Sequence, residues 1–380
     1  MENEVLFNDL KKQWDVIKDN ALGRISNLFD SSSFINGGDV SIFENNFAHY
    51  IGSKYAAGVS NGTDAIKLCV QAIDPKGKVG IIIPANTFIA TLLGAEMACP
   101  NAEFVLIDCN KYYQMDLNIL EDVLKNRRHE WDECIILPVH LYGHPCDILS
   151  ILLLSEEFDC QIIEDSSQAH GTTVSGGQKA GYYGHMSAFS MYPGKNLGAA
   201  GDAGVITTSD EELYNSVQLL KNWGSEEKYY YKRKGYNNRL DSIQAIIVDE
   251  KLKHLDDWNS NRIIVAELYN NKLNPEIMVT PKTAEYCEDH TYHIYPVRIL
   301  SGDRESFMTH LQEKGVQCGI HYPVPIELTN PYKNMGWDNP LTREYAKQLV
   351  SLPIHPFMSN DDIKKAIAVA NSYNYKKSFV

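Results

Sequence analysis

Short apolar runs alternate with helical patterns through residues 50–210 of this 380-residue chain. Runs rich in Val, Ile and Leu and bounded by Gly, Pro or Asn predict strands, and the segments between them have helical periodicity. We therefore expect βα units around a mostly parallel sheet whose strands are covered on both faces. The predicted strands are 55–59, 79–83, 103–107, 134–139 and 160–163. The first predicted helix follows the turn at 60–64 and ends at about 73, and the others span 86–98, 117–126 and 147–158.

The remainder of the chain indicates a second, smaller α/β domain. Because a single compact core rarely holds this many residues, we predict a large domain at 1–250 and a small C-terminal domain at 251–380. The expected elements are a helix from a capping box at 209–212 to about 223, a loop at 225–238, a long helix at 240–255, a strand at 293–299 and a last helix capped by 359–362.

The formal net charge of −14 argues against nucleic acids and anionic membranes as partners, because the chain has no basic field to attract phosphates. No apolar run is long enough to span a bilayer, and the acidic N-terminus lacks the apolar core of a secretion signal. The eight cysteines are scattered and form no C-x-x-C pair. We therefore expect reduced thiols in a cytoplasmic protein.

Lys195 lies in an unusually apolar setting for a lysine, within the sequence SMYPGKNLGAAGD at 190–202. Partial desolvation disfavours the ammonium form and leaves the amine nucleophilic. Amines of this kind form Schiff bases with carbonyl substrates or with pyridoxal phosphate. The alternative is an ordinary lysine in a glycine-rich surface loop.

The sequence SNGT at 60–63 follows a predicted strand and opens a predicted helix. Free backbone amides and the positive end of the helix make such a turn suitable for a phosphate group, although it is also an ordinary N-cap. Residues 58–62 also match the G-x-S-x-G elbow of serine hydrolases. That fold requires several strands before the elbow, whereas only about one precedes Ser60.

Glu164 and Asp165 come directly after the apolar run at 160–163 and end that strand, at the edge of a parallel sheet where ligands bind. A carboxylate there can pair with a pyridinium nitrogen, or it can simply cap the next turn. Gln168 and His170 follow and could bond substituents of a ring. Phe88 lies at a neighbouring strand-to-helix turn, where it could stack on a flat ring, although core packing is a more common role.

Other patterns give weak support to other chemistries. His140, His144 and Cys146 suggest zinc only if they share a helix, which Gly143 and Pro145 would break, and His290 with His293 is an equally weak pair, so we predict no metal. The chain contains neither a G-x-G-x-x-G fingerprint nor a Walker A loop.

Taken together, these segments resemble the DegT/DnrJ/EryC1/StrS family of sugar aminotransferases, which depend on pyridoxal phosphate. The resemblance covers nearly the whole chain and is carried by GVSNGTD at 58–64, PANTFIAT at 84–91, PVHLYGHP at 138–145, EDSSQAHG at 164–171, the segment around Lys195, and GYNNRLD at 235–241. It implies a fold type I aminotransferase and a homodimer with shared active sites.

The resemblance also assigns roles residue by residue. Lys195 and Asp165 match the catalytic lysine and the partner of the ring nitrogen. The matched cofactor contacts are Gln168 beside the ring hydroxyl, Phe88 stacked on the ring, Gly62, Thr63 and Ser190 at the phosphate, and Asn237 reaching the phosphate from the other subunit. The candidates for contacts with substrate are Lys228, Tyr229, Arg239, His321 and Tyr322.

The implied reaction moves an amino group from L-glutamate to a nucleotide-linked keto-sugar, and the details resemble enzymes that aminate C3 of dTDP-3-keto-6-deoxyhexoses. Ser166-Ser167, Gly194 and Glu327 depart from common family residues, which affects contacts with the sugar more than the cofactor set. The alternatives are a C4 aminotransferase on a UDP-, GDP- or dTDP-4-keto-sugar, a sugar dehydratase, which carries histidine at the position of Lys195, and a non-catalytic regulator that binds pyridoxal phosphate.

Overall fold

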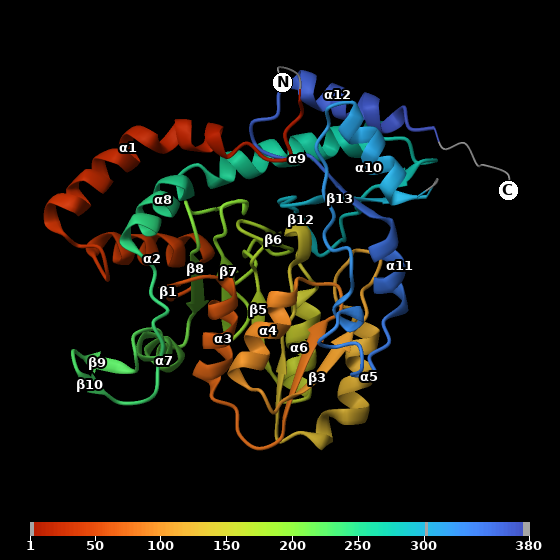
Figure 1. Cartoon of the computed structure of the whole chain (residues 1–380). Helices are drawn as coiled ribbons and strands as arrows, with labels where there is room; N and C mark the ends of the chain where they lie inside the picture. The colour runs from red at the N-terminus through yellow and green to blue at the C-terminus, as the bar shows by residue number, and fades with distance from the viewer. Residues whose placement is uncertain (1–3, 301–302, 375–380) are drawn as a thin grey trace.

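The computed structural model, which describes residues 4–300 and 303–374, is built around a seven-stranded sheet (Figure 1). Its order is β1-β8-β7-β5-β4-β2-β3. β8 runs antiparallel to both of its neighbours, and the other pairings are parallel, which confirms the predicted sheet. The strands are β1 (Tyr55–Val59), β2 (Val79–Pro84), β3 (Glu103–Ile107), β4 (Glu133–Ile136), β5 (Gln161–Asp165), β7 (Met186–Ser190) and β8 (Gly204–Thr208).

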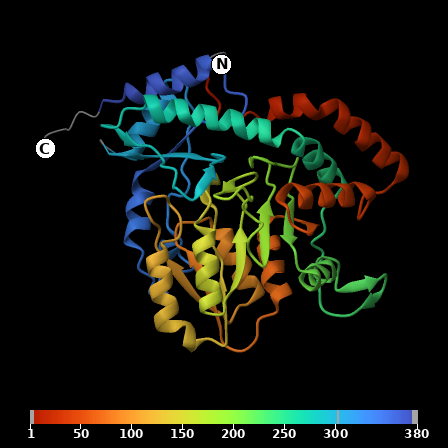
Figure 2. The same cartoon turned by 180° about the vertical axis from the view of Figure 1, so that it is seen from behind.

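Helices cover both faces of this sheet, as Figures 1 and 2 show from opposite sides. Alternate strand residues divide between the two faces: Ile81 and Ile83 join the core under α3, α4 and α7, whereas Ile82 and Ile136 join the core under α5 and α6. This is the arrangement expected of apolar strands buried on both sides. These helices are α3 (Gly62–Ile73), α4 (Ile89–Ala98), α5 (Leu117–Arg127), α6 (Ile148–Glu157) and α7 (Glu211–Lys221).

The C-terminal part has its own core around the three-stranded antiparallel sheet β11-β13-β14. Val5 packs into the same core and pairs with Val316. The division near residue 250 stays a prediction. The elements are α9 (Leu255–Lys272), β11 (Met278–Val279), β13 (Tyr295–Ile299), α10 (Arg304–Glu313), α11 (Pro340–Gln348), β14 (Leu349–Leu352) and α12 (Asn360–Asn371). A separate two-stranded sheet joins β12 (Cys287–Asp289) to β6 (Thr173–Val174), which lies between β5 and β7 in the chain.

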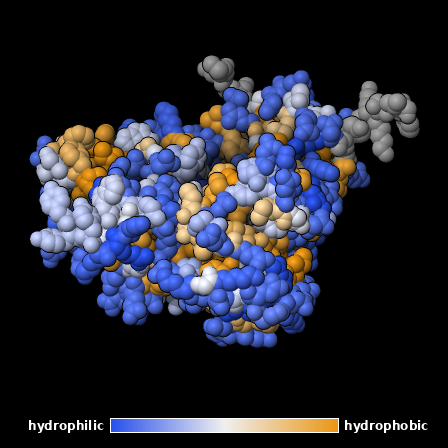
Figure 3. All heavy atoms as spheres, turned by 60° about the horizontal axis from the view of Figure 1, so that its bottom comes forward, coloured by the Kyte–Doolittle hydropathy of each residue, from blue (hydrophilic) through white to orange (hydrophobic). Residues whose placement is uncertain are grey.

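The helices α1 (Leu10–Ser31), α2 (Gly38–Ile51) and α8 (Ser242–Leu252) pack together beside β1 and β8. The Arg24 guanidinium of α1 donates to Asp39 of α2 and to Asp249 and Glu250 of α8, which ties the three helices together. Their outer side keeps apolar residues exposed, including Phe29. Figure 3 shows an apolar area at its left edge, the side on which Figure 1 draws the turn between α1 and α2.

Two predicted helix starts are wrong, and each has a local cause. The helix predicted from residue 86 begins at Ile89, because Phe88 has an extended backbone and the Asn86 side-chain amide donates to the carbonyl of Tyr113, in the turn between β3 and α5. Asp210 caps α7 in place of Ser209, since its carboxylate accepts the backbone amides of Glu212 and Leu213. The capping box at the last helix, Ser359 with Asp362, is confirmed.

Other boundaries also differ from the prediction. The helix predicted at 240–255 is confirmed as α8 (Ser242–Leu252), which ends three residues early at a turn where the His254 amide donates to the Lys251 carbonyl, and α9, which begins at Leu255, was not predicted. The loop predicted at 225–238 contains a short hairpin, β9 (Ser225–Glu227) and β10 (Tyr230–Tyr231). The strands predicted at 134–139 and 293–299 are shorter, because β4 ends at Ile136 and β13 begins at Tyr295.

The cysteines are all free, and six of the eight are buried. Within the described residues, no helix combines the length and apolar character needed to cross a membrane.

Candidate active site

Asp165 ends β5 at the carboxyl edge of the parallel strands, which point toward α9 in Figure 2. The side chain is buried, and both carboxylate oxygens are held. The Thr91 hydroxyl donates to Oδ2 at 2.7 Å, and the Ser167 backbone amide donates to Oδ1 at 3.1 Å. The carboxylate is therefore fixed at the edge of the sheet where ligands bind.

Gln168 lies in the turn that follows and links two parts of the chain. Its Oε1 accepts the Tyr142 backbone amide at 2.7 Å, and its Nε2 donates to the Tyr322 hydroxyl at 2.9 Å. Phe88, at the start of α4, has its ring centroid 5.2 Å from that of Tyr322. Phe88 is 49% exposed, so it has an open face for stacking on a flat ring.

Lys195 lies in the glycine-rich segment between β7 and β8, as the sequence indicates. Its side chain retains some exposed surface, but burial of the amine lowers its pKa to about 8 against the opposing effect of the Asp165 charge. Among the described residues, its amine has no hydrogen bond or ion pair. An amine that loses its proton this readily, near a fixed carboxylate, is suited to nucleophilic and base chemistry.

The turn before α3 lies against the end of β7. Asn61 caps the helix by accepting the Asp64 amide, which leaves the amides of Gly62 and Thr63 at the open helix end. A Cβ on Gly62 would lie 2.5 Å from the Ser190 Cβ, so only glycine allows this close approach. The amides and the Ser190 hydroxyl thus form a compact cradle for an anion.

These residues fit pyridoxal phosphate: the cradle suits its phosphate, Asp165 its ring nitrogen, Phe88 its ring face and Lys195 its aldehyde. The cradle would hold the phosphate with backbone amides rather than with a cation, which agrees with a chain of strongly negative net charge. The contacts themselves stay predictions.

His321 and Tyr322 extend the site from the C-terminal part of the chain. Tyr322 bonds Gln168, and His321 Nδ1 is hydrogen-bonded to the Ser351 hydroxyl at 2.8 Å. Burial, aided by the charge of Lys195, lowers the pKa of His321 to about 4, so the ring is neutral at physiological pH. The two residues therefore bring neutral hydrogen-bonding groups to the mouth of the site.

The remaining predicted residues lie in the hairpin and in the segment that follows it, which runs beside the turn before α3: Arg239 pairs with Val59, and the Asn238 carbonyl accepts the Ser60 amide. Lys228 and Tyr229 lie at the tip of the β9–β10 hairpin, which projects from the body beside α7 in Figure 1, and Tyr229 is 73% exposed. Asn237 is exposed and pairs with Asn222. Arg239 donates to the Asn222 side chain at 3.0 Å.

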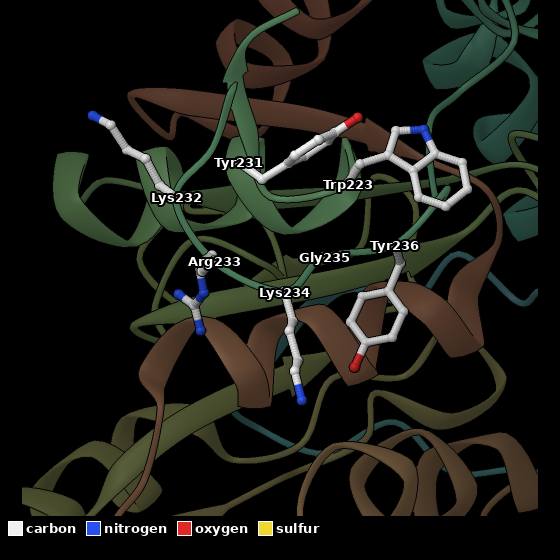
Figure 4. A pocket seen from close by; sticks show the side chains of 7 residues that line it. All are labelled: Trp223, Tyr231, Lys232, Arg233, Lys234, Gly235 and Tyr236. Carbon is white, nitrogen blue, oxygen red and sulfur yellow. The ribbon is translucent and has the colours of Figure 1, made fainter. Parts of the chain in front are cut away.

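A cavity of about 620 Å³ lies at the base of this hairpin, and Figure 4 shows the basic and aromatic side chains around it. Arg233 also donates to the Ser216 hydroxyl, which holds the base of the hairpin to α7. The surface concentrates positive charge on an acidic protein, as an anionic ligand requires. The lining residues are Trp223, Tyr231, Lys232, Arg233, Lys234, Gly235 and Tyr236.

The competing motifs are used in structural hydrogen bonds. His140 is bonded to Glu164 at 2.8 Å and accepts the Cys146 backbone amide, and His144 accepts the amide of Ala284. The Ser60 hydroxyl donates to Asp64 at 2.6 Å, so no histidine is placed to activate it as a hydrolase nucleophile within the described residues.

Two supporting residues were missed by the sequence reasoning. Thr91 fixes Asp165, although the two are 74 positions apart. Glu164, buried behind Asp165, binds His140 and the backbone amides of Gly181 and Gly184. The adjacent carboxylates at 164 and 165 could have revealed the role of Glu164. Successive residues of a buried strand face opposite sides, so Glu164 had to be buried too and needed hydrogen-bond partners of its own.

Comparison with known proteins gives consistent results. The model of the DegT/DnrJ/EryC1/StrS aminotransferase family matches residues 15–370. A dTDP-3-amino-3,6-dideoxy-alpha-D-galactopyranose transaminase from Aneurinibacillus thermoaerophilus is 37% identical over 92% of this chain and 94% of its own. A dTDP-3-amino-3,4,6-trideoxy-alpha-D-glucose transaminase from Streptomyces venezuelae is 33% identical over 96% of this chain and 94% of its own. The crystal structure of S. venezuelae DesV in complex with a ketimine intermediate superposes with a TM-score of 0.90 at 32% identity, covering 97% of this chain and 98% of DesV.

Proposed function

The chain belongs to the DegT/DnrJ/EryC1/StrS aminotransferase family and is a sugar-nucleotide transaminase that depends on pyridoxal phosphate, and we propose that it aminates C3 of a dTDP-linked 3-keto-6-deoxyhexose. The product is then a dTDP-3-amino-3,6-dideoxyhexose. The relative from A. thermoaerophilus carries this proposal, because it is a transaminase of that sugar class with 37% identity over nearly the full length of both chains.

The residues of this chain divide the work of the reaction. Pyridoxal phosphate supplies a ring that withdraws electrons from the carbon next to the transferred nitrogen. The Asp165 carboxylate holds a proton at the ring nitrogen, and Lys195 moves a proton between Cα of the donor and the cofactor carbon. With a pKa of about 8, roughly a tenth of Lys195 is uncharged at pH 7, far more than for an ordinary lysine.

We propose L-glutamate as the amino donor. The first half-reaction consumes one water, whose oxygen becomes the keto oxygen of the released 2-oxoglutarate, and leaves the nitrogen on the enzyme. The second transfers it to the keto carbon of the sugar, whose oxygen leaves as water. Because each product leaves before the next substrate binds, the kinetics should be ping-pong.

We also propose a homodimer in which the hairpin of one subunit completes the site of the other. Lys228 and Tyr229 lie at the exposed tip of the hairpin, where basic and aromatic side chains suit a nucleotide diphosphate, and Asn237, also exposed, is the candidate that reaches the cofactor phosphate of the other subunit. The exposed apolar side of α1, α2 and the turn between them, which includes Phe34 in that turn, provides surface for the contact between subunits. Arg239 is a further candidate for an anionic group of either substrate.

The test is the visible spectrum of the purified protein before and after L-glutamate, followed by identification of the product from each keto-sugar nucleotide. The expected result is a cofactor band that glutamate bleaches and that the 3-keto-sugar restores. Lys195→Ala should lose turnover, and full activity in that variant would contradict the mechanism. A 4-amino product would establish the C4 alternative, a deoxygenated product the dehydratase, and a band without a glutamate response the regulator.

A further inference from the structure

The loop that carries Lys195 is held from behind by side chains of α8 and α9. The Lys251 ammonium of α8 donates to the Gly198 carbonyl at 2.7 Å, and Gln244 of the same helix accepts the Ala200 amide at 2.8 Å. Asn196, next to the lysine, donates to Asn259 of α9 at 2.9 Å. The position of Lys195 therefore depends on helices outside its own loop.

Lys251 is the unusual member of this set. It is only 6% exposed, and its partners are the neutral Gly198 carbonyl and the Gln13 side-chain oxygen of α1, at 3.0 Å. Within the described ranges, no carboxylate lies within ion-pairing distance of it. Burial lowers its pKa to about 8.

Two other buried lysines show the usual arrangement. Lys221 donates to the Glu44 carboxylate at 2.9 Å and to the Gly58 carbonyl at 3.0 Å, and Lys67 donates to the Asp64 carboxylate at 2.6 Å. In both, an opposite charge offsets the loss of hydration. Lys251 has no such compensation, so its burial costs stability.

The role of Lys251 must therefore lie in what it joins. Its ammonium bridges the Gly198 carbonyl, three residues after Lys195, to α1. Gln13 is itself fully buried, its Oε1 accepts from Lys251, and its Nε2 has no hydrogen-bond partner among the described residues, so the Lys251 contact is what orients it. A methionine would fill the same space without the charge, but it would leave the loop unfastened at this point.

We propose that Lys251 is a positioning residue that fastens the Gly198 carbonyl to α1 through Gln13 and so keeps the Lys195 amine in its buried place. The proposal rests on the proposed function, which makes Lys195 the nucleophile. The titratable groups that face Lys195 are Asp165, His170, His293 and His321, and they are unchanged in the experiment below.

The experiment uses the full chain freed of cofactor and follows the rate at which added pyridoxal phosphate becomes covalently attached to Lys195, as a function of pH. Visible absorbance reports the attachment, and borohydride reduction with peptide mapping confirms the residue. We expect the midpoint near pH 8 to rise by about one unit in Lys251→Met, so that about ten-fold less uncharged amine is present at a given lower pH. The melting temperature should change little by comparison.

Lys221→Met is the matched control, because it also removes a buried ammonium from a backbone carbonyl. It should lower the melting temperature by stranding Glu44, but leave the midpoint of Lys195 unchanged. Lys251→Arg keeps the charge and the donors and should keep the midpoint, which separates loss of the bridge from the effect of any substitution at this position. If Lys251→Met does not fold, Gln13→Leu carries the test, because it cuts the same bridge at α1. An unchanged midpoint in folded Gln13→Leu would then contradict the proposal.

An unchanged midpoint in folded Lys251→Met would overturn the proposal while leaving the proposed function intact. Failure of the unsubstituted protein to attach pyridoxal phosphate at Lys195 at any pH would instead overturn the proposed function. An equal shift in Lys221→Met and Lys251→Met would show a general loss of stability and would also refute the positioning role.

Discussion

Gly62→Ala should weaken cofactor binding, because it places a methyl group where α3 meets β7. The added Cβ would lie 2.5 Å from the Ser190 Cβ and 3.0 Å from its Cα. Carbon atoms in contact are normally about 3.5–4.0 Å apart, so the turn or the strand end must move by about 1 Å. That movement would separate the open amides of α3 from the Ser190 hydroxyl, which together form the anion cradle.

The magnitude follows from the cost of overpacking, about 1–3 kcal/mol. If the turn relaxes in the protein without cofactor, the cost is borne on binding, and the dissociation constant of pyridoxal phosphate rises about ten- to a hundred-fold. If it does not relax, the same free energy appears as a loss of stability. The sum of the two changes is therefore the quantity to compare with the prediction.

The assay is a titration of the cofactor-free protein with pyridoxal phosphate, followed by absorbance, together with denaturant unfolding of each variant. Gly38→Ala is the matched control, since Gly38 also begins a helix but a Cβ there would meet nothing within 4 Å. It should leave both quantities unchanged. Wild-type affinity and wild-type stability in Gly62→Ala would refute the reasoning that this contact shapes the cradle.

Three further predictions concern the supports of the site. Thr91→Val removes the hydroxyl that donates to Asp165 and should reduce the free energy of unfolding, measured with urea, by about 1.5–3 kcal/mol, the usual worth of a hydrogen bond to a charged group; an unchanged free energy of unfolding would show that this hydroxyl does not hold Asp165. The pKa of Lys251 is lowered to about 8, so between pH 8 and about 10.5 the unfolded chain holds a proton on this amine that the folded chain has lost. Across that window the free energy of unfolding of the wild type, measured with denaturant, should rise by on the order of 3 kcal/mol relative to Lys251→Met. A difference that does not change with pH would contradict this expectation. Arg24→Met strands the buried Asp249 carboxylate and should reduce the free energy of unfolding by about 3 kcal/mol, measured with urea, and no loss would show that the pair is not needed.

The parts of the site that could be predicted are those encoded within a few residues. Lys195 stands out because its own neighbours are Gly, Ala and Pro, and Asp165 because it ends an apolar strand. Gly62 was found as part of a strand–turn–helix pattern. Each of these needs only local sequence and the rule that ligands bind at the carboxyl edge of a parallel sheet.

The parts that could not be predicted depend on contacts between distant segments. Thr91 reaches Asp165 across 74 positions, and Lys251 reaches Gly198 across 53. Neither residue has a neighbour in sequence that reveals its partner. The start of α4 was predicted wrongly for a related reason. The Asn86 side-chain amide donates to the carbonyl of Tyr113, a partner in another turn, and Asn86 is not part of the helix.

The two kinds of information are complementary in the loop of Lys195. Small residues around Lys195 lower the hydration of its amine, but glycines also make a loop flexible, and a flexible loop would let water return. The sequence of the loop therefore cannot by itself maintain the pKa of about 8 on which the proposed role of Lys195 depends. Rigidity must come from side chains outside the loop, and Lys251, Gln244 and Asn259 supply it from α8 and α9. The residues next to Lys195 thus account for the low hydration of its amine, whereas helices that follow it in the chain determine its position.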